Sequence, residues 1–166
     1  APGFASRAVV TIRGKSPVRS GPSADYARMM VLPPGAKLWA IGQEGSWYRV
    51  RLCDRLDGWI MTSDVRELDS DIQLGTARLT DMSASACETG TRLIFYLTRP
   101  VAFRIRQSVL PAQLKIDLFS CAAAQEAIRQ FPGTEAIRIL PPQQLATDWV
   151  EVTLGLPDVH QAGQQA

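Results

Sequence analysis

The chain has 166 residues, of which 46% are hydrophobic and 20% are charged, and its formal net charge is +2. This is the composition of an ordinary globular protein, without the excess of positive charge that would indicate a nucleic-acid partner. No run of the sequence approaches the roughly 18 apolar residues that a membrane-spanning helix needs. One domain or two small ones would fit this length, and the pattern of predicted strands favours two.

The first half of the chain consists of short strand-like segments between glycine and proline turns. Residues 8–12 are a β-branched run that predicts a strand, and the turn-rich stretch 14–23 is expected to be a loop around a short extended step at Val18-Arg19. Further strands are predicted over 26–32, 37–42, 47–52, 59–61 and 65–68, with turns over 33–35, 45–46, 54–58 and 62–64. Five or six such strands within about 60 residues indicate a small barrel.

The strand predicted over 47–52 alternates strictly. Its two faces are Tyr48, Val50 and Leu52 on one side and Trp47, Arg49 and Arg51 on the other. Because successive side chains of a strand point to opposite faces, the first set is expected in the core. The second set then places an indole beside two guanidinium groups, on the outside or at the mouth of the barrel.

Four sequence blocks follow one another through this half of the chain. They are Val18-Arg19-Ser20-Gly21-Pro22-Ser23, Leu32-Pro33-Pro34-Gly35, Gly45-Ser46-Trp47-Tyr48-Arg49-Val50 and Gly58-Trp59-Ile60. In this order and spacing they resemble the bacterial SH3-like (SH3b) family, which implies an SH3-like barrel over residues 6–69. Two positions depart from the family pattern: Pro17 stands where the family usually has Asn, and Arg55-Leu56-Asp57 replaces a glycine-containing approach to Gly58.

The second half of the chain is also rich in strands. Residues 68–71 form a polar junction that is too short for a flexible tether, so the two halves are expected to lie close together. Strands are predicted over 72–80, 91–98, 102–106, 113–119, 137–139 and 149–154, a loop over 82–90, and one short helix over 122–131, ended by Pro132-Gly133. A β-sandwich is the economical packing for these strands.

Several of these strands carry a second resemblance. They are Thr91-Arg92-Leu93-Ile94-Phe95-Tyr96-Leu97-Thr98-Arg99-Pro100, Phe103-Arg104-Ile105, Leu114-Lys115-Ile116-Asp117-Leu118, Ile137-Arg138-Ile139 and Val150-Glu151-Val152. This series is similar to the AMIN family of bacterial envelope domains, from which the helix over 122–131 departs. The resemblance implies an all-β chain: the barrel, an AMIN-like β-sandwich over 71–156, and a tail over 157–166.

The three cysteines, Cys53, Cys87 and Cys121, are too few for a disulfide framework and form no Cys-x-x-Cys pair. Binding of a metal by cysteine is therefore not expected. Cys87 and Cys121 flank the strand-rich stretch 91–119 and would pair if the flanking strands met, whereas the alternative is free buried thiols.

No catalytic centre is expected in this chain. The one histidine, His160, lies in a tail of Gly, Gln and Ala, whereas a zinc hydrolase needs several His and acidic ligands. A Cys-His or Ser-His-Asp site would need the same residue held rigidly. Asp69 and Asp71 lie in the junction, where solvation explains paired carboxylates better than glycosidase chemistry. The sequence thus predicts no enzyme activity, no metal and no cofactor.

Binding is the function that remains. The candidates in the first domain are Arg19, Tyr26, Trp47, Arg49 and Trp59, because aromatic faces stack on sugar rings or peptide bonds and guanidinium groups bind carboxylates. The alternative for Trp59 and Tyr48 is packing in the core or at its rim. In the second domain Arg92, Tyr96 and Arg104, with Lys115, could form a basic exposed face, and a solvated sheet face is the alternative.

Together the two resemblances imply an exported protein of the periplasm or cell envelope that binds or localises to peptidoglycan or its stem peptides. Such pairs often precede an N-acetylmuramoyl-L-alanine amidase domain, so the chain is expected to be the non-catalytic N-terminal part of such a hydrolase or a stand-alone targeting protein. Residues 1–4 carry no signal-peptide pattern, so the chain either never had one or is a mature product. The alternative is a protein-interaction or regulatory module that binds a partner peptide or an enzyme domain.

Overall fold

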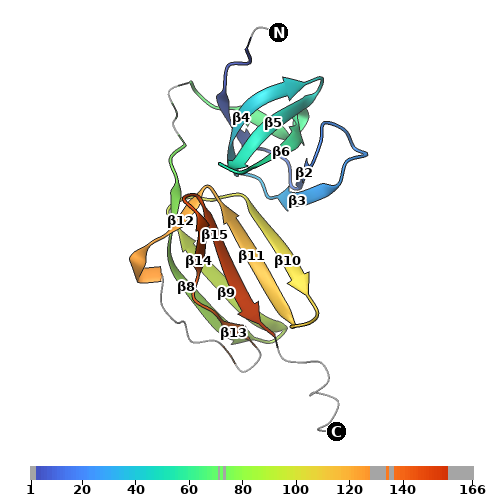
Figure 1. Ribbon diagram of the computed structural model, residues 1–166. Coiled ribbons are helices and arrows are strands. Elements are labelled where there is room, and N and C mark those ends of the chain that lie inside the picture. Colours follow the sequence, from blue (N-terminus) through green and yellow to red (C-terminus); the bar gives the residue numbers. More distant parts are fainter. Residues whose placement is uncertain (1–2, 71, 73, 128–133, 135–136, 157–166) are drawn as a thin grey trace.

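The computed structural model describes residues 3–70, 72, 74–127, 134 and 137–156, and these residues form strands in three sheets. Figure 1 shows two units stacked end to end, a barrel of β1 to β7 and a sandwich of β8 to β15. The helical segments in the described ranges are two 3-10 turns, η1 (Thr62–Asp64) and η2 (Gln125–Ala127). The all-β fold class is therefore confirmed, and none of the helices described is long and apolar enough to cross a membrane.

The first unit is one antiparallel sheet whose strands follow the order β3-β2-β6-β5-β4-β1-β7. Its strands are β1 (Arg7–Thr11), β2 (Ser16–Arg19), β3 (Arg28–Leu32), β4 (Lys37–Glu44), β5 (Trp47–Cys53), β6 (Leu56–Met61) and β7 (Val65–Glu67). Tyr48, Val50 and Leu52 of β5 are buried, as the alternation predicted. They meet Val18 of β2 and Ile60 of β6 in one core cluster.

Two segments predicted as loop or turn belong to strands of this sheet. Residues 16–19 form β2, which pairs with β3 along its length but with β6 only through Arg19. At Pro17, the edge of β2 that faces β6 is therefore unpaired, and a missing N–H is tolerated there. Gly58 lies within β6 rather than in a turn. Glycine is needed there because a Cβ would come within 2.4 Å of Val18 Cγ1, not because the chain turns.

The second unit is a sandwich of two sheets, as predicted. Its strands are β8 (Ala77–Cys87), β9 (Gly90–Leu97), β10 (Phe103–Ser108), β11 (Gln113–Phe119), β12 (Cys121–Ala123), β13 (Arg138–Ile139), β14 (Gln143–Ala146) and β15 (Trp149–Gly155). One sheet has the order β12-β8-β9 and the other β10-β11-β15-β13, with β14 also paired to β15. Leu79 and Met82 of the first sheet meet Ile116 and Val150 of the second in a shared core.

The loop predicted over 82–90 is wrong, because β8 continues to Cys87. Small residues have low strand propensity, but here residues 82–87 pair with 90–95 of β9, and this pairing decides their conformation. The strand predicted to begin at 72 begins at Ala77 instead. The four-residue strand β14 was not predicted.

The helix predicted over 122–131 is also wrong in its described part. Residues 121–123 form β12, parallel to residues 77–79 of β8, and residues 125–127 make a single 3-10 turn. The helix propensity of alanine is outweighed by backbone pairing with a neighbouring strand. Residues 128–131 of this prediction, Asp71 of the junction and the predicted tail over 157–166 lie outside the described residues.

All three cysteines are free in the structure. Cys121 pairs with Ala77 at the start of β8, whereas Cys87 ends that strand, so they are about 33 Å apart along it at 3.3 Å per residue. This separation excludes the disulfide that was considered. Cys53 and Cys121 are buried, but Cys87 is exposed, so the alternative of buried thiols holds for two of the three.

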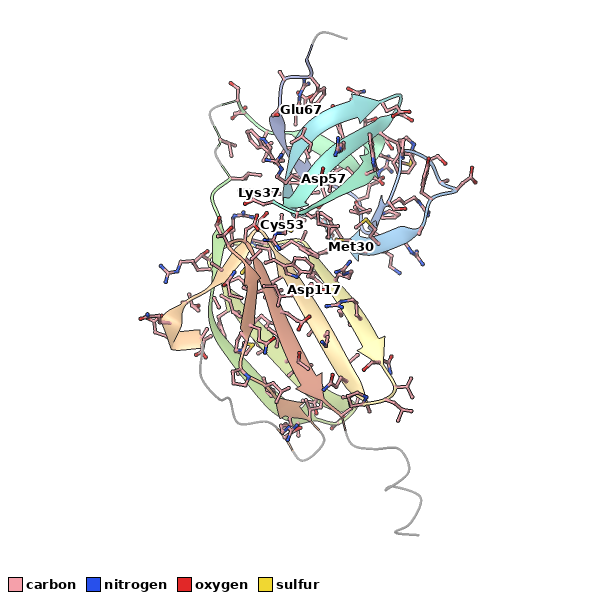
Figure 2. The ribbon with its side chains drawn as sticks, viewed as in Figure 1. Met30, Lys37, Cys53, Asp57, Glu67 and Asp117 are labelled. Atoms are coloured by element: carbon pink, nitrogen blue, oxygen red, sulfur yellow. The ribbon has the colours of Figure 1, made fainter. Side chains whose placement is uncertain are left out.

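The two units lie against each other, as the short junction predicted. Ala102 and Phe119 of the sandwich belong to the core cluster of the barrel. Ser120 Oγ donates a hydrogen bond to the Leu52 carbonyl at 2.8 Å, and the Asp54 N–H donates to the Asp148 carboxylate at 2.8 Å. Figure 2 shows Cys53 at the end of the barrel that faces the sandwich, with Glu67 at the opposite end.

Candidate functional site

Three of the predicted binding residues lie in one row across β2, β6 and β5, which we call the outer row: Arg19, Trp59 and Arg49. Arg19 lies directly opposite Trp59, and Trp59 lies directly opposite Arg49. Directly paired residues project from the same face of a sheet, so the Trp59 side chain projects from the same face as those of Arg19 and Arg49, from the strand between theirs. This is the outer face of the barrel, because the neighbouring Val18 and Ile60 are completely buried.

Trp47 extends the same face by one more residue pair. Along β5 it projects on the same side as Arg49, and it lies opposite Met61 of β6 and Glu44 of β4. The Met61 side chain is exposed, and Trp47 is half-buried. Aromatic and cationic side chains therefore adjoin over two successive rows of the sheet.

Tyr26 is tied to this surface through its backbone. Arg19 Nη1 donates to the Tyr26 carbonyl at 3.0 Å, and the exposed Tyr26 ring covers Gly21, where a Cβ would lie only 2.4 Å from it. Arg19 thus holds the loop through Tyr26, while Asp25 bonds with Ser23. The structure therefore brings all five predicted residues of the first domain to neighbouring positions.

The two arginines of the outer row differ in their partners. Arg49 Nη2 forms an ion pair with the Asp57 carboxylate at 2.8 Å. Arg19 has no carboxylate within 4.0 Å among the residues that the structure describes, and its hydrogen bond to Tyr26 uses one of five guanidinium N–H groups. Arg19 therefore keeps donors for an acidic group of a ligand, while Arg49 is largely neutralised.

The predicted residues of the second domain are not brought together. Arg92 and Tyr96 project outward from β9 in one sheet of the sandwich, and Arg104 projects from β10 in the other. The outer faces of two packed sheets point in opposite directions. Lys115 lies on the Arg104 face, with its Nζ 3.6 Å from a Glu151 carboxylate oxygen. The basic face considered from the sequence is thus divided between two surfaces.

The Arg104 surface is an ion-pair network rather than a free basic patch. At its centre is the buried Asp117, which accepts hydrogen bonds from Arg104, Arg106 and Trp149. Burial raises the pKa of Asp117, but the hydrogen bonds from these three side chains outweigh it, so the net pKa lies below the ordinary value. This arrangement stabilises a charged carboxylate on the outer face of the sheet, covered by the side chains that bind it, and leaves little of it for a ligand.

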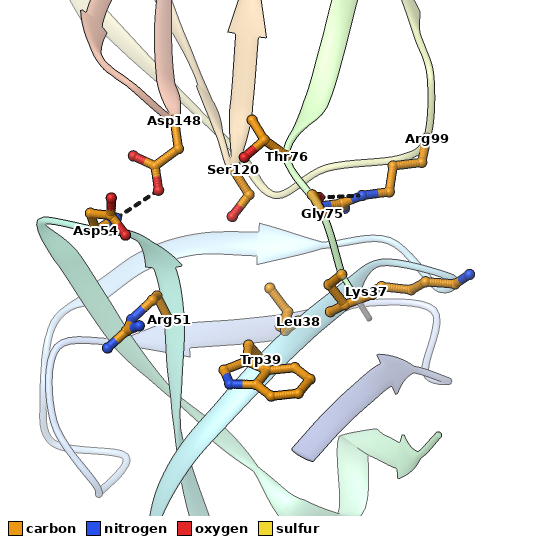
Figure 3. Close-up of a pocket in the computed structure, with 11 residues that line it drawn as sticks. Lys37, Leu38, Trp39, Arg51, Asp54, Gly75, Thr76, Arg99, Ser120 and Asp148 are labelled. Carbon is orange, nitrogen blue, oxygen red and sulfur yellow. Dashed lines mark hydrogen bonds between the residues drawn. The ribbon is translucent and has the colours of Figure 1, made fainter. Parts of the chain in front are cut away.

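A pocket of about 420 Å³ between the two units was not predicted. Figure 3 shows Arg51, Leu38, Trp39 and Lys37 of the barrel on one side and Asp148, Ser120, Thr76 and Arg99 of the sandwich on the other. These residues come from segments far apart in the sequence, and only the stacking of the units unites them. The one available signal was Trp39, an aromatic residue on the same strand face as Lys37.

No group of three or more His, Cys, Asp or Glu side chains in the described ranges is placed to hold a metal ion. The candidate site therefore consists of the outer row with Trp47 and Tyr26, and its chemistry is stacking and binding of anions. This surface lies almost wholly on β2, β5 and β6 and the loop after β2.

The same stretch has a family match. Residues 14–66 match the family model of the bacterial SH3 domain, whose members are typically non-catalytic binding modules and often bind the cell wall. No curated protein and no solved structure matches the chain. Neither the AMIN-like resemblance nor an amidase context receives support from these matches. Residues 14–66 therefore form a bacterial SH3 domain.

Proposed function

We propose that this chain is a non-catalytic cell-wall-binding module, and that peptidoglycan binds across the outer row, Trp47 and Tyr26. The observation that carries this proposal is the row of Arg19, the half-buried Trp59 and Arg49, paired across three strands on the outer face of a bacterial SH3 domain. A flat indole stacks on a sugar ring or a peptide plane, and guanidinium groups bind carboxylates with directional hydrogen bonds. Peptidoglycan offers sugar rings and acidic stem peptides side by side.

Binding to purified sacculi tests this function. The chain should co-sediment with the sacculi, and the sacculi should remain undigested. Replacing Arg19 by Gln should weaken binding by about tenfold, because a hydrogen bond to a charged group contributes about 1.5–3 kcal/mol. The matched control is Arg66→Gln, since Arg66 is an exposed arginine of β7, away from β2, β5 and β6. Chain that stays in the supernatant over a range of salt concentrations would contradict the proposal.

Replacing Trp47 by Ala gives a second variant that does not depend on charge. We expect a similar loss of binding with little loss of stability, because Trp47 is only half-buried and lies outside the core. Leu145→Ala is the control, since Leu145 is an exposed apolar residue of the other domain. Equal losses for Trp47→Ala and Leu145→Ala would show that binding does not depend on this face of the barrel.

We further propose the finer context that the sequence implied: an exported protein of the periplasm or envelope, with a binding domain over 6–69, an AMIN-like domain over 71–156 and an amidase as its catalytic partner. Arg92, Tyr96 and Arg104 would then contribute a second, weaker contact with the wall. The sequence downstream of residue 166 tests the amidase context, because a following domain should carry His and Glu zinc ligands. Capture of a protein partner in place of sacculi would favour the interaction-module alternative.

A further inference from the structure

The pocket between the two units contains polar groups whose hydrogen-bonding capacity is not used. It is a separate site from the outer row, so its role does not rest on binding to the cell wall. Its volume of about 420 Å³ lies within the range of about 300–1,000 Å³ that is typical of small-molecule sites. Both domains contribute to its walls, and Figure 3 shows Trp39 on one side, across from Ser120 and Thr76.

Arg99 is the cationic group on the sandwich side of this pocket. Its guanidinium donates to the carbonyl oxygens of Gly75 and Pro100, which uses three of its five N–H groups. No carboxylate lies within 4.0 Å of it among residues 3–70, 72, 74–127, 134 and 137–156. Burial lowers the pKa of Arg99, which is the expected behaviour of a partly desolvated cation without a counter-charge. An anion placed here would supply that counter-charge.

Asp148 is the complementary group on the same side. One carboxylate oxygen, Oδ2, accepts the Asp54 N–H at 2.8 Å. The other oxygen, Oδ1, is buried and has no hydrogen-bond donor in the described part of the chain. A buried carboxylate oxygen without a donor costs free energy, so an N–H or ammonium group of a ligand would stabilise it.

We propose that this pocket binds the zwitterionic end group of an amino acid or short peptide, with the ligand ammonium at Asp148 and a ligand carboxylate at Arg99. Three cations, Lys37, Arg51 and Arg99, line the pocket against two carboxylates, Asp54 and Asp148. This balance favours a ligand with one more carboxylate than ammonium groups, as in an acidic dipeptide. The indole of Trp39 provides a flat apolar surface for the peptide plane.

Calorimetric titration of the full chain with the dipeptide alanyl-glutamate tests this site. We compare it with N-acetyl-alanyl-glutamate, which lacks the ammonium group, and with alanyl-glutamine amide, which lacks both carboxylates. The free dipeptide should bind, and each altered form should bind at least about tenfold more weakly. Equal affinity for the three ligands, or no binding of alanyl-glutamate at millimolar concentration, would overturn the proposal.

Variants at two positions, Arg99 and Asp148, test which residue binds which end of the ligand. Arg99→Gln should weaken alanyl-glutamate about tenfold but leave the affinity for the amide unchanged, and Arg99→Lys should restore part of the loss. Asp148→Asn should weaken the free dipeptide but not its acetylated form, because Asn keeps an oxygen for the Asp54 N–H. The matched control is Arg66→Gln, whose arginine is exposed and does not line the pocket. Thermal melting identifies any variant that fails to fold. For such a variant, the comparison of the three ligands on the unaltered chain decides whether the pocket binds both charged ends of the dipeptide.

Dipeptide binding and sacculus binding can be tested independently of each other. Trp47→Ala should leave the affinity for alanyl-glutamate unchanged, since Trp47 lies outside the pocket. Loss of dipeptide binding in Trp47→Ala would contradict a separate site. Sacculus binding without dipeptide binding would overturn this inference alone.

Discussion

Arg106 binds both carboxylate oxygens of Asp117, with Nε 2.8 Å from Oδ2 and Nη2 2.9 Å from Oδ1. This two-pronged geometry matches the planar guanidinium to the planar carboxylate. Arg104 Nε also donates to Oδ2 at 3.0 Å, and Trp149 Nε1 donates to Oδ1 at 3.1 Å. One buried carboxylate thus connects β10, β11 and β15 on the outer face of their sheet.

Replacing Asp117 by Asn should lower the free energy of unfolding by about 2 kcal/mol. The change leaves Arg104 without its counter-charge and leaves Arg106 with Glu151 as its one carboxylate partner among the described residues. The loss is below that of a fully buried pair because Arg106 is partly exposed and keeps this second ion pair. Urea denaturation measures it. Lys115→Gln is the control and should cost at most about 1 kcal/mol, since its 3.6 Å ion pair with Glu151 is longer and partly exposed. A larger effect of Lys115→Gln would contradict the central role of Asp117.

Stability should fall in acid because of the same carboxylate. The folded-state pKa of Asp117 is lowered, so its stabilising contribution is complete above the unfolded pKa of about 3.9 and is lost as the pH falls through the folded value. Glu67 acts in the same direction, because hydrogen bonds from Arg7 and Tyr48 lower its pKa. The difference in unfolding free energy between the unaltered chain and Asp117→Asn should therefore be constant from pH 5 to 7 and shrink below about pH 4. A difference that grows in acid would refute this assignment.

Replacing Gly58 by Ala should destabilise the barrel by about 2 kcal/mol, through overpacking of its core. The new Cβ would lie 2.4 Å from Cγ1 of the completely buried Val18. Gly42→Ala is the matched change in β4 of the same sheet, where the nearest side-chain atom, Arg49 Cβ, is 3.6 Å away. We expect its effect on the thermal midpoint to be near zero, and similar losses in both variants would show that strand glycines are interchangeable here.

The three thiols should differ sharply in their reactivity toward iodoacetamide at pH 8. Cys87 is exposed and should be alkylated first. Burial raises the pKa of Cys121 to about 11 and also raises the pKa of Cys53, so both carry little thiolate and are shielded from the reagent. Peptide mass spectrometry after partial alkylation should find one modified site. Early modification of Cys53 or Cys121 would mean that the contact between the units opens readily.

Local alternation was enough to predict the parts of the fold where one strand face is buried. In β5 it separated the buried Val50 from the outward Arg49. The outer row itself was not predicted, because the sequence left Trp59 open between ligand binding and packing, and its place opposite Arg49 depends on the register of β5 and β6. The pairing of Arg19 with Trp59 could not be read from the sequence, since it depends on a register between β2 and β6.

The failures arise where contacts between distant segments decide the conformation. Residues 83–86 are small and polar enough for a loop, yet they pair with β9, and Ala122 lies in an alanine-rich segment but pairs with β8. Asp117 gave no sign in the sequence that it would neutralise Arg104. The pocket at Arg99 and Asp148 exists only because the two units stack, and no local pattern encodes that stacking.

Phe119 of the sandwich packs into the core of the barrel, and this contact has a consequence for synthesis on the ribosome. The last barrel strand, β7, ends at Glu67, so all the barrel strands are synthesised before Ala102 and Phe119. N-terminal domains generally begin to fold during translation. The nascent barrel must therefore present an open apolar end until β11 arrives to close it. The sandwich, which is synthesised later, therefore covers the apolar end of the barrel and completes its core. A ribosome stalled before Phe119 should carry a barrel that chaperones can still bind.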